Sequence, residues 1–191
     1  MGEPLIFFKG VTHVQVKGGF SAIANHIAAA EARPLWDKTC MFSEVVEAYK
    51  PFYQIMYLQI RSPAPFVSNR DIVLLGRLRL EENGSVLFSV RSTEYHHLPE
   101  RPDFVRADFR QGGYIVRPTA DPEIIQVTFA GFVDVKGWLP DWVKSFVMWE
   151  QGLTLEAFRS YIQRLETQAE EVSLGTSDDP AVRQEDSTVR R

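Results

Sequence analysis

The stretch Asp134-Val135-Lys136-Gly137-Trp138-Leu139-Pro140 marks the point at which the hydrophobic period of the sequence changes. Before it, residues 123–133 alternate apolar and polar side chains, as a β-strand does. After it, apolar residues recur every three or four positions from Asp141 to about Leu165, which predicts a long helix with one apolar face. The aromatic stripe of this helix needs a large apolar partner, and most of the preceding chain has the pattern of a sheet.

Length and composition indicate one globular domain. The 191 residues are 45% hydrophobic and 24% charged, which suits a chain that can bury a sizeable core. A net charge of −4 gives no reason to expect a nucleic-acid partner. The single cysteine, Cys40, excludes an intrachain disulfide and favours a reducing compartment, so the cytoplasm is the expected location. The first residues do not have the pattern of a signal peptide.

About seven strands joined by short turns are expected between the first short helix and residue 134. They are residues 41–49, 52–61, 71–80, 86–95, 104–110, 114–117 and 123–133, and a further extended segment, residues 5–16, precedes that helix. Asn83-Gly84 is typical of a tight hairpin, because both residues tolerate positive φ angles. Gly112-Gly113 is expected to turn the chain between two extended segments. Short turns favour an antiparallel meander, and the fold class is therefore α+β.

Two further segments complete the expected organisation. A short helix from Ala22 to Ala32 is predicted, with Pro34 after its end. Beyond Glu166 the composition becomes polar and acidic. We expect the globular domain to span residues 1–168 and residues 169–191 to form a disordered acidic and polar tail.

Four stretches, in this order, resemble the START domain, the lipid-transfer domain related to the steroidogenic acute regulatory protein. They are residues 35–37 (Leu-Trp-Asp), 69–73 (Asn-Arg-Asp-Ile-Val), 105–108 (Val-Arg-Ala-Asp) with 113–116 (Gly-Tyr-Ile-Val), and 134–140. The resemblance covers about Pro4 to Leu165 and implies a helix-grip fold, in which a curved antiparallel sheet wraps around the C-terminal helix. It also implies an apolar tunnel for one lipid or sterol, gated by that helix and by an Ω-loop matching residues 61–69.

Two features depart from the family pattern. The family begins with a helix and two strands that have no counterpart before residues 5–16. This should leave a sheet edge unpaired beside the strand at residues 123–133, and such an edge is a candidate contact for a partner or a homo-oligomer. Some family members place an arginine inside the tunnel where this chain has Gly76, and the neighbouring Arg77 belongs to the opposite face of the strand.

The inward faces of the strands and of the long helix supply the candidate tunnel wall. The wall residues are Met56, Leu58, Leu74, Gly76, Phe88, Val90, Phe129, Trp149, Leu153 and Phe158. A solid core would need the same apolar pattern, so periodicity alone favours packing and only the resemblance favours a tunnel. Gly76 is the most informative of them, because glycine inside a strand often marks a close approach or free space.

Three residues are candidates for the gate and its membrane contact. Phe66 and Val67 belong to the tip of the loop at residues 61–69, where they either insert shallowly into a membrane surface or tuck under the loop. Gly152 weakens the long helix and indicates either a close packing contact or a soft point in the gate. Trp138 and Trp142 are expected to lock the turn and the base of the helix rather than to touch ligand.

Nothing in the sequence has the spacing of a catalytic or metal site. His96-His97 are expected on a surface loop, because no second ligand pair follows at the spacing of a zinc site. Arg106, Asp108 and Arg110 share one face of a strand and are expected to form an ion-pair ladder. We therefore expect no catalytic residue, no metal ligand and no cofactor.

These observations favour a non-enzymatic lipid-binding protein that holds a lipid or sterol in an internal tunnel, for transfer between membranes through transient surface contact. The alternative is a START-like interaction or regulatory module that uses the open sheet edge. A cyclase or aromatase of the wider helix-grip superfamily is disfavoured, because no acid–base pair is evident.

Overall fold

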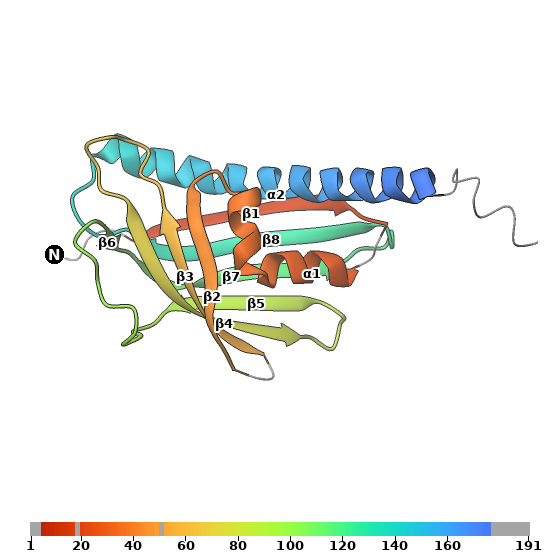
Figure 1. Cartoon of the computed structure of the whole chain (residues 1–191), viewed down its shortest axis with the longest axis horizontal. Coiled ribbons are helices and arrows are strands. Elements are labelled where there is room, and N and C mark those ends of the chain that lie inside the picture. The colour runs from red at the N-terminus through yellow and green to blue at the C-terminus, as the bar shows by residue number, and fades with distance from the viewer. Residues whose placement is uncertain (1–4, 18–19, 50–51, 177–191) are drawn as a thin grey trace, which may run out of the picture.

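A curved sheet and a long C-terminal helix make up the computed structural model, which describes residues 5–17, 20–49 and 52–176 (Figure 1). The strands are β1 (Ile6–Gln15), β2 (Cys40–Tyr49), β3 (Tyr53–Ile60), β4 (Arg70–Leu80), β5 (Val86–Ser92), β6 (Val105–Arg106), β7 (Asp108–Pro118) and β8 (Ile124–Asp134). The helical segments are α1 (Phe20–Ala28), the 3₁₀-helix η1 (Ala30–Leu35) and α2 (Asp141–Thr176). The expected α+β, helix-grip architecture is confirmed.

The order of the strands corrects the expected sheet edge. The path is β1-β8-β7-β5-β4-β3-β2 with antiparallel neighbours, while β6 pairs with β4 in parallel. β1 pairs with β8 from Ile6 opposite Val133 to Gln15 opposite Ile124. The expectation of an unpaired edge beside residues 123–133 is therefore wrong, because β8 lies between β1 and β7. The path through the described residues ends at β1 and β2 instead.

The glycine pair at residues 112–113 lies inside a strand and is not the expected turn. β7 runs through it, with Gly113 opposite Ser89 on one side and Ala130 on the other. At Gly113 φ is +136°, and a Cβ would lie 1.9 Å from the carbonyl oxygen of Phe88. Only glycine allows β5 to approach β7 so closely. The predicted hairpin at Asn83-Gly84 is confirmed, with φ at +78° for Gly84.

The helices differ from expectation at their ends. α2 begins at Asp141 as predicted but continues to Thr176, so the first part of the expected tail is helical. Residues 177–191 lie outside the described residues, and the boundary of the domain stays a prediction. The expected helix at residues 22–32 is divided into α1 and η1, and Pro34 lies inside η1 rather than after the helix.

The core lies between the concave face of the sheet and α2, which runs alongside β1 (Figure 1). Phe158 on α2 is fully buried and meets Trp36 edge-on, with ring centroids 5.1 Å apart. α2 also approaches β1 closely, because a Cβ on Gly10 would lie 2.9 Å from Cδ1 of Leu155. Glycine at position 10 therefore sets how near the helix comes to the sheet.

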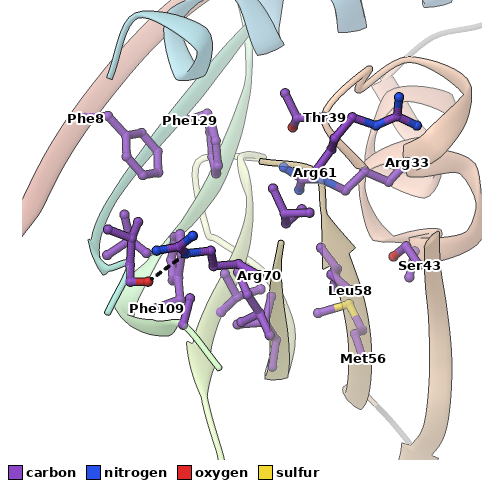
Figure 2. Close-up of a pocket in the computed structure, with 18 of the residues that line it drawn as sticks. Phe8, Arg33, Thr39, Ser43, Met56, Leu58, Arg61, Arg70, Phe109 and Phe129 are labelled. Carbon is purple, nitrogen blue, oxygen red and sulfur yellow. Dashed lines mark hydrogen bonds between the residues drawn. The ribbon is translucent and has the colours of Figure 1, made fainter. Parts of the chain in front are cut away.

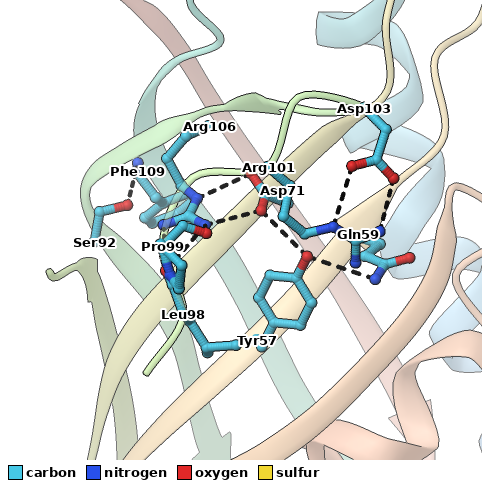
Figure 3. Close-up of polar contacts among 10 residues, drawn as sticks. All are labelled: Tyr57, Gln59, Asp71, Ser92, Leu98, Pro99, Arg101, Asp103, Arg106 and Phe109. Carbon is cyan, nitrogen blue, oxygen red and sulfur yellow. Dashed lines mark hydrogen bonds and ion pairs between the residues drawn. The ribbon is translucent and has the colours of Figure 1, made fainter. Parts of the chain in front are cut away.

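A buried ion pair fixes the opposite face of the sheet (Figure 3). Asp71 is fully buried and accepts hydrogen bonds from Nε and Nη2 of Arg106, each at 2.9 Å. The hydroxyl of Tyr57 donates a third bond to this carboxylate at 3.2 Å. Arg106 Nη2 also donates to the carbonyl oxygen of Pro99 at 3.1 Å, so the pair ties the loop before β6 to β4. Hydrogen bonding to Asp71 raises the pKa of Arg106 above its ordinary value.

The expected ion-pair ladder is only partly right. Arg110 pairs with Asp108 at 3.1 Å and with Asp134 at 3.6 Å. Arg106, however, belongs to the short strand β6 beside β4, and its partner is Asp71. The break between β6 and β7 redirects Arg106, and strand periodicity alone does not reveal that break.

We predict that Asp71→Asn destabilises the fold by about 3 to 5 kcal/mol, because it leaves the guanidinium of Arg106 largely buried without its counter-charge. Arg106→Met should cost a similar amount, and the double variant should cost clearly less than the sum of the two. Urea denaturation measures these differences. The control is Arg79→Met, which removes an exposed ion pair with Glu81 and should cost under about 1 kcal/mol. Additive losses for Asp71 and Arg106 would contradict the coupling.

Candidate functional site

A cavity of about 140 Å³ lies between the concave face of the sheet, η1 and the start of α2. Most of its lining is apolar. Six predicted wall residues line it: Met56, Leu58, Leu74, Phe88, Val90 and Phe129. Figure 2 shows Phe8 and Phe129 on one side of the cavity, facing Met56, Leu58 and Ser43 on the other. The cavity thus separates the β1–β8 side of the sheet from the β2–β3 side.

Four predicted wall residues lie elsewhere. Gly76 lies beneath the wall, because a Cβ there would meet Cε of Met56 at 2.8 Å and Cζ of Phe88 at 3.0 Å. Glycine at position 76 therefore lets the side chains of Met56 and Phe88, both in the lining, pack directly over the backbone of β4. Phe158 is buried in the core against Trp36 rather than at the cavity. Trp149 and Leu153 are wrongly placed by the pattern, since α2 exposes both of them to solvent.

A charged side chain enters the cavity from η1, an element that supplies none of the predicted wall residues. Arg33 on η1 lines the cavity, and its guanidinium lies over the ring of Phe129 at 6.0 Å (Figure 2). Nε of Arg33 donates to Oδ2 of Asp37 at 2.9 Å, Nη2 forms an ion pair with the same oxygen at 2.9 Å, and Nη1 donates to the hydroxyl of Tyr114 at 3.3 Å. These three contacts engage all three nitrogens of the guanidinium, which carries five N–H donors.

The sequence contained a signal for this residue. Arg33 and Asp37 are four positions apart, the spacing at which side chains on one helical face meet. The family resemblance instead placed an arginine at the position of Gly76, on β4. In this chain the cation, Arg33, comes from η1, just before Trp36-Asp37.

The surroundings of Arg33 shift several pKa values. Burial alone lowers the pKa of Arg33, but Tyr114 and Asp37 outweigh it, so the pKa lies above its ordinary value and the guanidinium is charged. Burial raises the pKa of the Tyr114 hydroxyl. Burial also raises the pKa of the Cys40 thiol to about 11, despite the nearby charge of Arg33. Tyr114 and Cys40 are therefore neutral at physiological pH.

Two buried polar atoms of the lining have no hydrogen-bond partner among the described residues. They are Nε1 of Trp36 and Oγ of Ser43, in residues that are 5% and 6% exposed. By contrast, the hydroxyl of Thr39, also in the lining, donates to Asp37 Oδ1 at 2.6 Å. A buried polar group without a partner costs about 1 to 3 kcal/mol, so these two atoms are expected to meet something else.

Arg70, a buried residue at the start of β4, also lines the cavity. Its Nε donates to the carbonyl oxygen of Val135 at 3.1 Å, and Nη2 donates to that of Lys136 at 2.8 Å. Its Nη1 donates to the carbonyl oxygen of Ser68. One guanidinium therefore joins the loop at residues 61–69 to the turn that precedes α2.

The loop and the start of α2 also share a small apolar cluster. Ala64, Val67, Leu139 and Val143 are buried together. Val67 thus tucks under the loop, whereas Phe66 is 64% exposed and meets Trp142 edge-on at 6.3 Å. Gly152 lies within α2.

The expectation that Trp138 and Trp142 lock the turn and the helix base is wrong, because both are exposed. The next residue after each tryptophan is buried instead: Leu139 in the turn and Val143 at the base of the helix. The hydrophobic period located the base of the helix correctly but assigned its buried face one position too early.

An apolar ridge results on the outer side of α2 and of the loop at residues 61–69. We call Phe66, Trp142, Trp149 and Leu153 the aromatic ridge; all four are exposed. The intervals of seven and four residues between Trp142, Trp149 and Leu153 keep them on one side of α2. α2 therefore has apolar residues on two sides. The sheet buries one side, and the other side is exposed to solvent.

Within the described residues, no three His, Cys, Asp or Glu side chains come together in a way that could hold a metal ion. His96 and His97 are exposed on the surface, as expected. Among the same residues, no helix is both long and apolar enough to cross a bilayer.

Comparison with known proteins adds an independent line of evidence. The family model of the START domain matches residues 14–170. START domain-containing protein 10 of Homo sapiens and of Mus musculus is 31% identical to the chain over 113 residues, which are 59% of this chain and 38% of each of those proteins. The match therefore spans less than half the length of these relatives.

Solved structures agree on the fold. The structure of human STARD10 matches with a TM-score of 0.76 at 21% identity, covering 94% of this chain and 75% of that one. Human StAR-related lipid transfer protein 5 matches with a TM-score of 0.73 at 20% identity, covering 86% and 76%. Since the family model matches most of the chain and the architecture agrees, this protein belongs to the START domain family.

Proposed function

We propose that this protein binds one amphipathic lipid in the cavity between the sheet and α2, and exchanges it with membranes. Membership of the START family supports lipid binding in general. The observation that carries the finer proposal is a largely apolar cavity with three arginines in its lining, Arg33, Arg61 and Arg70, of which Arg33 lies over the ring of Phe129. Apolar walls provide affinity, since each CH₂ group removed from water contributes about 0.8 kcal/mol. A fixed cation orients a polar end.

The size of the cavity supports a gated mechanism. At about 140 Å³ it is smaller than the roughly 300 to 1,000 Å³ of typical ligand pockets. A lipid therefore enters only if the walls separate. The loop at residues 61–69 and the start of α2 are the segments that cover the mouth, and Arg70 joins them. Loss of these contacts at a membrane would widen the cavity.

A binding reaction tests the proposal directly. Purified protein is incubated with vesicles carrying labelled phospholipids or sterols, and lipid recovered with the protein is measured. We expect extraction of at least one class. Arg33→Met should reduce extraction of a lipid with an anionic or acceptor-rich headgroup by about tenfold, because charge-assisted hydrogen bonds contribute about 1.5 to 3 kcal/mol. Arg91→Met on β5, an exposed arginine, is the matched control. Failure to extract any lipid from a broad panel would reject the function.

Membrane contact is assigned to the aromatic ridge in this proposal. Of the three gate residues predicted from sequence, Phe66 keeps this role, while Val67 is buried beneath it. Tryptophan favours the interface between headgroups and acyl chains, where its apolar ring and its N–H are both satisfied. For Gly152 both interpretations stay predictions: a close packing contact within the fold, or a weak point at which the gating helix bends. The cytoplasm stays the proposed location, on the argument from the single cysteine.

We predict that Trp142→Ala combined with Trp149→Ala weakens binding to vesicles by about tenfold or more, because it removes apolar area that would insert into the interface. Vesicle sedimentation measures the binding. Phe52→Ala is the control, since Phe52 is similarly exposed but lies in the connection between β2 and β3. Equal losses for the control and the ridge variant would reject the assignment.

A second function, as an interaction module, is favoured by one observation. Among the described residues, β1 has a strand on one side only. On its outer face Phe7 and Val11 are each 50% exposed, and Phe7 lies against Phe132 with ring centroids 4.8 Å apart. An open edge beside apolar side chains is suited to pairing with a second copy of the chain.

Size in solution separates the two functions. If the β1 edge pairs two copies, light scattering should report a dimer, and Phe7→Lys should return a monomer by placing a charge at the contact. Val46→Lys, on the outer face of β2 at the far end of the sheet, is the control that should leave the mass unchanged. A monomeric wild-type protein that carries lipid would exclude the interaction module.

A further inference from the structure

We propose that the indole N–H of Trp36 and the hydroxyl of Ser43 form a second polar subsite in the cavity, which takes the carbonyl oxygens of an acyl-ester lipid. This inference rests on the proposed lipid-binding function and names the ligand class more narrowly. It separates ester-linked lipids from sterols and from ether-linked lipids.

The first argument comes from the unpaired atoms. Nε1 of Trp36 and Oγ of Ser43 are buried in the cavity lining, and no described residue pairs with them. Other polar groups near η1 and β2 are paired: Asp37 accepts hydrogen bonds from Nε of Arg33 and the hydroxyl of Thr39, and Glu31 accepts the backbone N–H of Val45. Two orphaned groups in one lining are therefore an exception within a well-paired region.

The second argument is that packing holds both residues in place. Trp36 is fixed between Phe158, which meets it edge-on at 5.1 Å, and the guanidinium of Arg33, 5.3 Å from its ring centroid. Ser43 lies in the β2–β3 ladder opposite Leu58, itself a lining residue. Because neither residue can leave its position without breaking these contacts, its partner has to come from the cavity.

The chemistry of the two groups selects the partner. An indole N–H can only donate, so it requires an acceptor, and a hydroxyl can donate to one as well. Arg33 has two further N–H donors beyond its bonds to Asp37 and Tyr114. A sterol offers a single hydroxyl oxygen to this set of donors. An acyl-ester lipid offers the acceptors of its headgroup and, a few bonds away, the carbonyl oxygens of its ester linkages.

Arg33 and Trp36 are neighbours in the cavity lining. Arg33 lies over the Trp36 ring, so a headgroup at the guanidinium would place the adjoining ester groups beside the indole. Figure 2 shows Arg33 and Ser43 at the same side of the cavity, across from Phe8. The apolar remainder of the lining is left for the acyl chains.

The test compares a diacyl phospholipid with its dialkyl ether analogue, which has the same headgroup and chain length but lacks the carbonyl oxygens. Binding of each is measured on delipidated full-length protein. We expect wild-type protein to bind the ester about tenfold more tightly than the ether. Ser43→Ala and Trp36→Phe should each weaken ester binding about fivefold and leave ether binding unchanged, since a hydrogen bond contributes about a factor of five. Ser89→Ala and Trp138→Phe, outside the cavity, should change neither.

Several outcomes would overturn the inference. Equal affinity of wild-type protein for ester and ether, or equal losses for both ligands in the variants, would mean that water satisfies the two groups. Binding of sterol but of neither phospholipid would overturn this inference and leave the proposed function intact, whereas no binding at all would reject both. Ser43→Ala should melt no lower than wild type, because it removes an unpaired buried hydroxyl. It therefore carries the test alone if Trp36→Phe fails to fold.

Discussion

The enclosure of the cavity depends on one guanidinium. Arg70 donates to backbone carbonyl oxygens of Ser68, Val135 and Lys136, and so holds the loop at residues 61–69 against the turn before α2. Backbone carbonyls cannot be replaced by mutation of their own residues, which makes the clamp insensitive to side chains on either partner. Both segments that cover the mouth converge on a single side chain, and a change at either one is therefore felt by the other.

Asp71, the next residue along β4, makes a corresponding contact on the opposite face of the sheet. Successive side chains of a strand point to different sides, so Arg70 faces the mouth of the cavity and Asp71 faces Arg106. The buried pair fastens the loop before β6 to the outer side of the sheet. The start of β4 thus anchors both layers of the fold.

Polar groups inside the cavity have a cost that the rest of the fold offsets. Arg33 keeps its charge through Asp37 and Tyr114, while Trp36 and Ser43 remain without partners among the described residues. A solid apolar core in their place would be more stable. α2 shows the same compromise on its outer side, where the aromatic ridge faces solvent although its buried side already packs on the sheet. Both features oppose stability and fit a protein that meets apolar partners on two surfaces.

Local patterns in the sequence were sufficient for many of the elements: the strand alternation, the hairpin at Asn83-Gly84 and the start of α2 at Asp141 depend on neighbours within a few residues. Six of the ten predicted wall residues line the cavity for the same reason, because alternation assigns each strand residue to a face. Trp149 and Leu153 were misplaced, since α2 has apolar residues on two sides and its sequence does not show which one meets the sheet. The pairing of β1 with β8, the strand through Gly112-Gly113 and the arrival of Arg33 at the cavity wall were decided only by tertiary structure. Each is a contact between distant parts of the chain, and no local period records it.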